Sequence, residues 1–395
     1  MISVKEATRI INSTLFIPRV QTVQLQECIG LILAEEIKAD RDLPPFDRIT
    51  MDGIALSFKE YVNGQREFSI EGVQAAGKAP LRLKDSNGSI EVMTGALLPI
   101  GTDTVIPYEN ITINNSIATL SEQKISEGQN IHQQGQDAKK SDILLRPGVI
   151  LSPAEVALLA SVGKNNVVVY EFPKTAIIST GDELVDVDQN PLPYQIRKSN
   201  SYSLQASLKQ LGCASTLFHL KDNKEEIEKE LSLILSNYDL IILSGGISKG
   251  KFDFVPLALE SLGIKKQFHQ VAQKPGKPLW FGCSKNKFVF ALPGNPVSTY
   301  LCFYKYVKLW LMKSLKAEVQ ESTAILAKDY IFNSPLTYFL QVQTKNESGK
   351  LMAYPIAGGG SGDFANLKDV DGFLELPKEK SEFKVGEAYT IIQFR

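Results

Sequence analysis

The sequence predicts an α/β multidomain protein whose central part is a doubly wound α/β domain. Three observations support this: the length of the chain, an alternation of strand and helix patterns from Pro173, and stretches of short strands on either side of it. A chain of 395 residues is too long for one ordinary hydrophobic core, so we expect roughly two to four domains. With 43% hydrophobic and 22% charged residues, the composition is that of an ordinary globular protein.

Two helices are predicted by their start signals. In the opening segment SVKEATRIINSTL, Ser3 and Glu6 have the spacing of a capping box, in which two side chains satisfy free N–H groups at the helix start. Ser152 and Glu155 repeat this spacing in LSPAEVALLASVG. We therefore expect one helix in each segment.

Residues from about 40 to 145 predict a β-rich insertion between these helices. The segment is rich in Gly, Pro and Asn and holds short runs such as SIEVMTG and TDTVIPYENITI. Alternating apolar and polar residues are typical of strands with one buried face, and Gly, Pro and Asn are typical of turns.

The doubly wound domain is predicted from Pro173 onward. The strand patterns KTAIISTG, ASTLFHL and YDLIILSGG alternate with the helix patterns SNSYSLQASLKQLG, NKEEIEKELSLILSN and FVPLALESLG. Continuous apolar strands joined by helices indicate a parallel sheet covered on both faces. After about residue 318, short strands with polar turns predict a small antiparallel barrel or sandwich.

Charge and cysteine content exclude several classes of partner and site. The formal net charge is -1, so we expect neither nucleic acid nor an anionic membrane as the main partner. The four cysteines form no CxxC pair and no cluster with the three histidines, which supports neither a disulfide framework nor a structural zinc site. Residues 1–20 show no secretory signal pattern, and three lysines interrupt the apolar run 299–315. We therefore expect a cytoplasmic protein.

The expected carboxyl ends of the strands carry the unusual residues. STGDEL follows the first strand, Lys221 and Asp222 follow the second, SGGISKGKFD follows the third, and ALPGNPVS follows the last and opens a helix. Ligands bind outside the carboxyl ends of the strands in a doubly wound sheet. The residues that we expect around one crevice there are Gly181, Asp182, Glu183, Asp222, Ser244, Gly245, Gly246, Ser248, Asp253, Pro293, Gly294, Asn295, Pro296 and Ser298.

The residue types at these ends predict a phosphate ligand with a divalent cation. Gly245 and Gly246 let backbone N–H groups approach a phosphate, and the helix that begins near Asn295 offers unpaired N–H groups to another anion. Acidic residues among these donors indicate a Mg²⁺ ion that bridges phosphate to carboxylates. The candidate carboxylates are Asp182, Glu183, Asp222 and Asp253.

The run KPGKP places Lys274 and Lys277 on a rigid turn, because each proline fixes its own φ. A fixed pair of cations suits an anion, although such a turn taken alone is more often a solvated surface turn. The glycines, carboxylates and lysines that follow the predicted strands favour the anion site. The neighbouring GGISKGKF matches a P-loop, but Phe252 stands where Ser or Thr binds Mg²⁺, which argues against an ATPase.

The β-rich insertion holds a second set of polar residues. LPPFDRITMDGIAL contains Asp47 and Asp52, and MTGALLPIGTDTVIPYEN contains Thr94 and Glu109. Such Asp side chains more often form turns when taken alone. The sharper interpretation is a site shared across domains or subunits.

Seven motifs in order resemble the molybdopterin molybdenumtransferases, the family of MoeA and the E-domain of gephyrin. They are PPFDRITMDGIA, MTGALLPIGTDTVI, GQDAKKSDILLRPG, STGDEL, LSGGISKGKFDF, KPGKPLWFG and LPGNPVS, and they span essentially the whole chain. The resemblance implies a homodimer whose site is shared between subunits. It also implies four domains: an elongated helical domain (1–40 and 141–172), a β-rich insertion domain (41–140), a molybdopterin-binding α/β domain (173–316) and a C-terminal β-barrel domain (317–395).

The implied reaction inserts molybdate into adenylylated molybdopterin, requires Mg²⁺, and gives molybdenum cofactor and AMP. A molybdopterin adenylyltransferase would be the upstream partner. By motif position, the metal and pterin-phosphate pocket would contain Glu183, Asp222 and Asp253. Anion and molybdate handling would fall to Lys274, Lys277, Ser298 and Ser361. Asp52 and Thr94 would reach in from the partner subunit, and the residues expected to be catalytic are Asp52, Glu183, Asp222, Asp253, Lys274 and Lys277.

Several cations of the family pattern are neutral in this chain. Gln270 stands where the family has a lysine, His132 stands where it has an arginine, and Leu336 and Gln341 stand near two further arginine positions. Three hypotheses follow: a working transferase, a CinA-like enzyme that acts on another nucleotide, and a pterin-binding scaffold without turnover. The insertion and the barrel argue against the second, because a stand-alone α/β enzyme would not need them.

Overall fold

The computed structural model describes the chain except residues 122–123, 222 and 247–253. The described chain divides into two compact units, and each is treated by itself. Unit 1 consists of Met1–Glu35, Pro147–Val156 and Asn166–Arg395, and unit 2 consists of Glu36–Arg146 and Ala157–Asn165. The four domain boundaries expected from the sequence stay a prediction.

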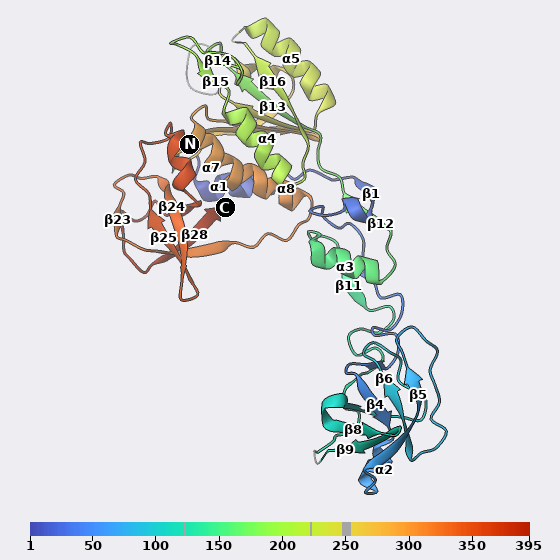
Figure 1. Ribbon diagram of the computed structural model, residues 1–395. Coiled ribbons are helices and arrows are strands. Elements are labelled where there is room, and N and C mark those ends of the chain that lie inside the picture. Colours follow the sequence, from blue (N-terminus) through green and yellow to red (C-terminus); the bar gives the residue numbers. More distant parts are fainter. Residues whose placement is uncertain (122–123, 222, 247–253) are drawn as a thin grey trace. The chain divides into compact units, whose positions relative to one another are not determined.

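Unit 1 contains the doubly wound α/β domain (Figure 1). Its described residues form a six-stranded sheet in the order β16-β13-β17-β21-β20-β18. The strands are β13 (Thr175–Thr180), β16 (Ser215–Leu220), β17 (Leu240–Ser244), β18 (Lys265–Gln270), β20 (Pro278–Ser284) and β21 (Lys287–Leu292). The expected parallel arrangement is confirmed for β16, β13, β17 and β21. In contrast, β20 runs antiparallel to both β21 and β18. A tight turn with Lys285 at φ 47° joins β20 to β21 as a hairpin.

Helices cover both faces of this sheet, as the sequence predicts. On β13, Ile177 joins the core beneath α4, whereas Ala176 and Ile178 join the core beneath α5 and α6. The helices of unit 1 are α1 (Val4–Asn12), α4 (Asn200–Gln210), α5 (Lys224–Asn237), α6 (Val255–Ser261), α7 (Pro296–Cys302) and α8 (Lys308–Ser314), with a π-helical turn at Phe303–Val307. None of the helices in the described chain is long and apolar enough to cross a membrane.

Both predicted helix starts are confirmed. The Ser3 hydroxyl accepts a hydrogen bond from the Glu6 N–H at 3.1 Å, and the helix α1 turns its apolar face into the core of the α/β domain. At α3 (Pro153–Ser161), the Ser152 N–H donates to the Glu155 carboxylate at 2.8 Å. These contacts satisfy N–H groups that a helix start otherwise leaves unpaired.

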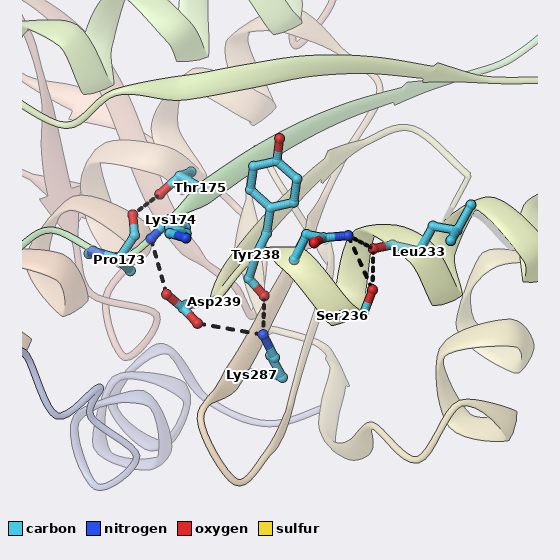
Figure 2. A network of polar contacts seen from close by, with 9 residues as sticks. Pro173, Lys174, Thr175, Leu233, Ser236, Tyr238, Asp239 and Lys287 are labelled. Atoms are coloured by element: carbon cyan, nitrogen blue, oxygen red, sulfur yellow. Dashed lines mark hydrogen bonds and ion pairs between the residues drawn. The ribbon is translucent and has the colours of Figure 1, made fainter.

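At the amino-terminal ends of the parallel strands, hydrogen bonds and an ion pair connect the neighbouring turns (Figure 2). The Lys287 ammonium donates to the Tyr238 carbonyl at 2.7 Å and lies 3.5 Å from the Asp239 carboxylate, which also accepts from the Lys174 N–H. The Thr175 hydroxyl donates to the Pro173 carbonyl at 2.9 Å. Turn and capping residues therefore occupy this edge, and the unusual loops lie at the opposite one.

The C-terminal part of unit 1 is a closed five-stranded β-barrel, because β24 pairs with both β25 and β26. Its strands are β22 (Ser322–Leu326), β24 (Thr337–Glu347), β25 (Lys350–Pro355), β26 (Gly372–Leu376) and β28 (Ala388–Gln393). Its core includes Leu340, Val342 and Leu374. The barrel that the sequence predicts is therefore confirmed, but it is not antiparallel throughout, because β22 pairs with β25 in parallel.

Shorter elements complete unit 1. They are β1 (Val20–Gln24) with β12 (Asn166–Tyr170), β14 (Leu184–Val185) with β15 (Ile196–Arg197), β19 (Gln273–Lys274), β23 (Tyr330–Ile331) with β27 (Glu382–Phe383), and the 3₁₀ turns Leu25–Glu27 and Phe364–Asp369.

Unit 2 is β-rich, as expected for the insertion. Its main sheet has the order β7-β4-β6-β5-β9-β8. The strands are β4 (Gly53–Leu56), β5 (Glu67–Gln74), β6 (Gly88–Val92), β7 (Thr104–Pro107), β8 (Ile111–Asn114) and β9 (Ile117–Leu120). The other elements are β2 (Ile37–Lys38) with β11 (Ile143–Leu145), β3 (Arg48–Ile49) with β10 (Ile131–His132), α2 (Phe58–Val62) and the 3₁₀ turn Tyr108–Asn110.

Candidate functional site

A cavity of about 670 Å³ lies in unit 1, where the strand exits of the α/β domain meet the lysine turn and the barrel. The predicted site residues in its wall are Gly181, Glu183, Gly245, Gly246, Lys274, Lys277, Pro293, Gly294, Asn295, Ser298 and Ser361. A neighbouring cavity of about 290 Å³ adds two more predicted residues, Ser244 and Pro296. The fold thus gathers most of the residues that the sequence places around one crevice.

Three predicted residues, Asp222, Ser248 and Asp253, lie outside the described residues, as does most of the segment that resembles a P-loop. Asp182 is described and exposed, but it is not part of either cavity wall.

The lysine turn is attached to the barrel. Strand β19 pairs in parallel with β24, with Lys274 opposite Tyr338. The Lys274 ammonium lies 5.7 Å from the centre of the Phe332 ring, a distance that suits a cation–π contact. The Lys277 ammonium forms no hydrogen bond or ion pair with any residue of the described ranges. Both lysines are exposed and belong to the cavity wall, whereas Phe332 does not.

Gly245 and Gly246 lie at the exit of β17 in left-handed conformations, with φ of 96° and 67°. The Gly245 N–H already donates to the Leu292 carbonyl at 3.2 Å, so the prediction that it is open to a phosphate is wrong for this residue. A Cβ atom on Gly246 would lie 2.8 Å from the Thr180 hydroxyl oxygen and 3.0 Å from Val255. A side chain therefore does not fit there, as expected for a loop that brings its backbone close to a ligand. The Thr180 hydroxyl is buried and forms no hydrogen bond within the part of the chain that the structure describes.

The start of α7 is less open than the sequence predicts. The Val297 N–H already donates to the Ser361 carbonyl at 3.1 Å, and the Asn295 side chain donates to the Ser361 hydroxyl at 2.7 Å. Ser361 belongs to the loop between β25 and β26, so these two hydrogen bonds connect that loop to the start of α7. Ser298, which is 3% exposed, follows directly in the cavity wall.

Glu183 brings a carboxylate to the cavity. It is exposed, and its carboxylate forms no hydrogen bond or ion pair with another described residue. Among the described residues, no group of three or more His, Cys, Asp or Glu side chains could hold a metal ion. Of the predicted metal ligands, Glu183 is therefore the one that the described structure places in the site.

The neighbouring cavity contains a polar bridge that sequence reasoning missed. The Asn200 side chain donates to the Ser244 hydroxyl at 2.8 Å and to the Gly294 carbonyl at 2.7 Å. It thereby joins the last residue of β17 to the loop that follows β21. Asn200 opens α4, and a helix-start signal was visible in the sequence, but its partners lie 44 and 94 residues away.

The loop that follows Glu183 is held by a charged cluster. Asp186 accepts hydrogen bonds from the Tyr202 hydroxyl at 2.7 Å, the Val187 N–H at 2.9 Å and the Lys198 ammonium at 3.2 Å. These bonds, the one from Tyr202 first, lower the pKa of Asp186 to about 2. Lys198 borders the smaller cavity with its charge already paired.

The barrel side of the cavity is neutral. It includes Leu336, Tyr338, Phe339 and Gln341, two of which stand near the family's arginine positions. The side-chain oxygen of Gln341 (Oε1) accepts a hydrogen bond from the side-chain amide of Asn366 at 3.2 Å. Tyr338 and Phe339 gave no functional signal in the sequence, because their pattern is that of an ordinary strand.

Asp52 and Thr94 meet in unit 2. The Thr94 N–H and hydroxyl both donate to one carboxylate oxygen of Asp52, at 2.5 Å and 2.7 Å. These two bonds lower the pKa of Asp52 and keep it charged near neutral pH. His132, also in unit 2, contacts Arg48 through Nδ1 and Asp137 through Nε2.

Comparison with known proteins covers almost the whole chain. Residues 2–163 match the family model described as MoeA N-terminal region (domain I and II), residues 176–313 the probable molybdopterin binding domain, and residues 323–394 the MoeA C-terminal region (domain IV). A molybdopterin molybdenumtransferase from Synechocystis sp. is 40% identical over 98% of this chain and 99% of its own length. One from Haemophilus influenzae is 33% identical over 96% and 95%.

Solved structures of the same family are also similar to this chain. Two structures of the molybdopterin biosynthesis moeA protein from Pyrococcus horikoshii superpose with TM-scores of 0.85 and 0.80, at 28% and 30% identity. Each covers 100% of this chain, and this chain covers at least 99% of each.

Proposed function

Since the chain belongs to the molybdopterin molybdenumtransferase (MoeA) family, we propose that it inserts molybdate into adenylylated molybdopterin and releases AMP. This reaction makes it a transferase of molybdenum cofactor biosynthesis, the role that its relatives carry in their name. The observation that supports the proposal most is the cavity whose wall holds Lys274 and Lys277 together with Ser298, Ser361 and the loop of Gly245 and Gly246. Both substrates are anions, and this wall supplies ammonium and hydroxyl groups that can donate to anions.

Different residues of the cavity wall would bind the two substrates. The glycine loop and the strand exits would hold the pterin and its phosphate, as expected for ligands at the carboxyl ends of a doubly wound sheet. Lys274 and Lys277 would bind molybdate beside the pterin and stabilise the charge on the departing AMP phosphate. Because the barrel side of the cavity is neutral, these two lysines would supply most of the positive charge.

Mg²⁺ belongs to the proposal, and Glu183 fits it, because this carboxylate lies in the cavity wall and has no other partner among the described residues. Asp222 and Asp253 would complete its ligand set. When bound, the ion would neutralise negative charge on the phosphate group whose bond is cleaved. The expected result of Glu183→Gln is a higher Mg²⁺ requirement for AMP release.

We extend the proposal to a homodimer in which Asp52 and Thr94 of one subunit complete the cavity of the other. The two hydrogen bonds that keep Asp52 charged support a polar role for this pair. A molybdopterin adenylyltransferase in the cytoplasm would supply the nucleotide.

The test is anaerobic incubation with adenylylated molybdopterin, Mg²⁺ and molybdate, followed by measurement of AMP and of the reconstitution of an apo-molybdoenzyme. We expect AMP release to depend on molybdate and to accompany reconstitution. Tight binding of the nucleotide without AMP release would instead support a pterin-binding scaffold.

A further inference from the structure

We propose that Gln273 is a positioning residue, whose buried side chain holds the Lys274–Lys277 turn in shape and connects it to the helix that carries Ser298. The inference rests on the proposed function in so far as it treats the two lysines as the oxyanion donors. Gln273 is not part of the set predicted from the sequence.

Both polar atoms of the Gln273 side chain form hydrogen bonds inside the protein. The residue is 0% exposed. Its amide nitrogen donates to the carbonyl of Pro275 at 3.2 Å and to that of Gly276 at 3.1 Å, the two residues between the lysines. These bonds satisfy the two carbonyl groups of the turn, and the Gly276 carbonyl also accepts a weak hydrogen bond from the Cys302 thiol at 3.9 Å.

Tyr306 fixes the orientation of this amide. Its hydroxyl, on a residue that is 1% exposed, donates to the Gln273 carbonyl oxygen. Since the oxygen is held by Tyr306, the nitrogen must face the turn carbonyls. Tyr306 lies in the π-helical turn Phe303–Val307, which directly continues α7. Single π-helical turns within helices are found frequently at functional sites.

The turn packs directly against this pair. Gly276 has a φ of 84°, and a Cβ atom on it would lie 2.7 Å from the Cys302 sulfur and 2.9 Å from the Gln273 amide nitrogen. The Lys277 carbonyl accepts from the Val271 N–H at 3.0 Å, which closes the turn. The backbone of the turn is thus held from inside, and the exposed lysine side chains lie on the cavity side.

The sequence lacked a signal for this role. A glutamine before a proline-glycine turn normally indicates a solvated surface residue. Gln273 is buried by contacts with distant segments: its backbone pairs with β24, and its side chain contacts Cys302 and Tyr306.

The experiment compares four variants: Gln273→Met, which keeps the length of the side chain and removes its polar atoms, Gln273→Glu, which removes the donor, Tyr306→Phe, and the double variant Gln273→Met with Tyr306→Phe. Gln343→Met is the matched control, because Gln343 is half-buried on β24 and is not in the cavity wall. Two quantities are measured: the molybdate concentration that half-saturates AMP release, and the Kd of the nucleotide. Thermal unfolding identifies variants that do not fold.

We expect Gln273→Met and Gln273→Glu to raise the half-saturating molybdate concentration about ten-fold and to leave the nucleotide Kd within about two-fold. Tyr306→Phe should have a smaller effect in the same direction. The double variant should lose less than the product of the single effects, because the two side chains act as one unit. A folded Gln273 variant or Tyr306→Phe with unchanged molybdate dependence, or equal losses for molybdate and nucleotide, would overturn the inference.

A second measurement separates this inference from the proposed reaction. Molybdate alone should protect Lys274 and Lys277 of the wild type from an amine-acylating reagent, detected by mass spectrometry, and Gln273→Glu or Tyr306→Phe should weaken that protection. If the wild type releases no AMP but shows this pattern, the proposed function fails and the positioning role stands. No protection in the wild type would overturn the positioning role, because the lysine pair would then hold no oxyanion.

Discussion

Lys274 lies opposite Tyr338 in a short parallel ladder between β19 and β24, which joins the lysine turn of the α/β domain to the C-terminal barrel. The barrel therefore supports the turn as well as forming one side of the cavity. Changes in either partner should affect anion binding.

The first prediction concerns the lysines themselves. Lys274→Ala and Lys277→Ala should each remove a charge-assisted hydrogen bond to an oxyanion, worth about 1.5–3 kcal/mol, or roughly ten-fold to a hundred-fold in molybdate affinity. The nucleotide Kd should change less. Lys285→Ala, at the turn of the β20–β21 hairpin and outside both cavity walls, is the control. Unchanged turnover in both cavity variants would remove the anion role from this turn.

The second prediction concerns charge on the barrel side. Gln341→Arg places a cation in the cavity wall where none is present among the described residues of the barrel. The half-saturating molybdate concentration should fall about three-fold to ten-fold, the size expected for one partly solvated ion pair. Gln343→Arg on the same strand adds equal charge outside the wall and should have little effect. Equal responses of the two variants would indicate a general effect of charge.

The third prediction tests the glycine loop. Gly246→Ala should destabilise the protein more than Gly263→Ala, because both residues have positive φ but only Gly246 is crowded. A left-handed alanine costs about 1–2 kcal/mol. The clash with Thr180 and Val255 should add about 1–3 kcal/mol. Denaturant unfolding measures the difference, and equal losses would show that the neighbours of Gly246 move aside.

The fourth prediction concerns acid stability. The pKa of Asp186 is lowered to about 2 from an ordinary value of 3.8, first by the Tyr202 hydroxyl. A carboxyl whose pKa is lower in the folded state contributes stability above its unfolded pKa, and this contribution is lost as pH falls from 3.8 toward 2. Tyr202→Phe should raise the pKa of Asp186 and reduce the fall in stability over this pH window. Unfolding curves at a series of pH values measure the slope, and identical slopes would contradict the assignment.

The sequence was informative where the physical signal is local. The capping boxes at Ser3 and Ser152 predicted two helix starts, and continuous apolar runs predicted the parallel strands. Gly245 and Gly246 could be assigned to the crevice because they follow a strand of the predicted doubly wound sheet, at the edge where ligands bind.

What the sequence could not supply depends on contacts between distant segments. The ladder between β19 and β24 joins residues 64 positions apart, and two residues are too few for a strand period. The burial of Gln273 follows from that ladder and from Tyr306. The start of α7 looked open in the sequence because its partner, Ser361, comes from the loop of another domain.

The most direct test of the account is single-turnover AMP release from bound adenylylated molybdopterin, measured anaerobically with Mg²⁺ at increasing molybdate concentrations. We expect AMP release that requires molybdate, saturates with it, and is lost when Lys274 and Lys277 are both replaced by alanine. AMP release that is independent of molybdate, or tight nucleotide binding with no AMP release at any molybdate concentration, would contradict it.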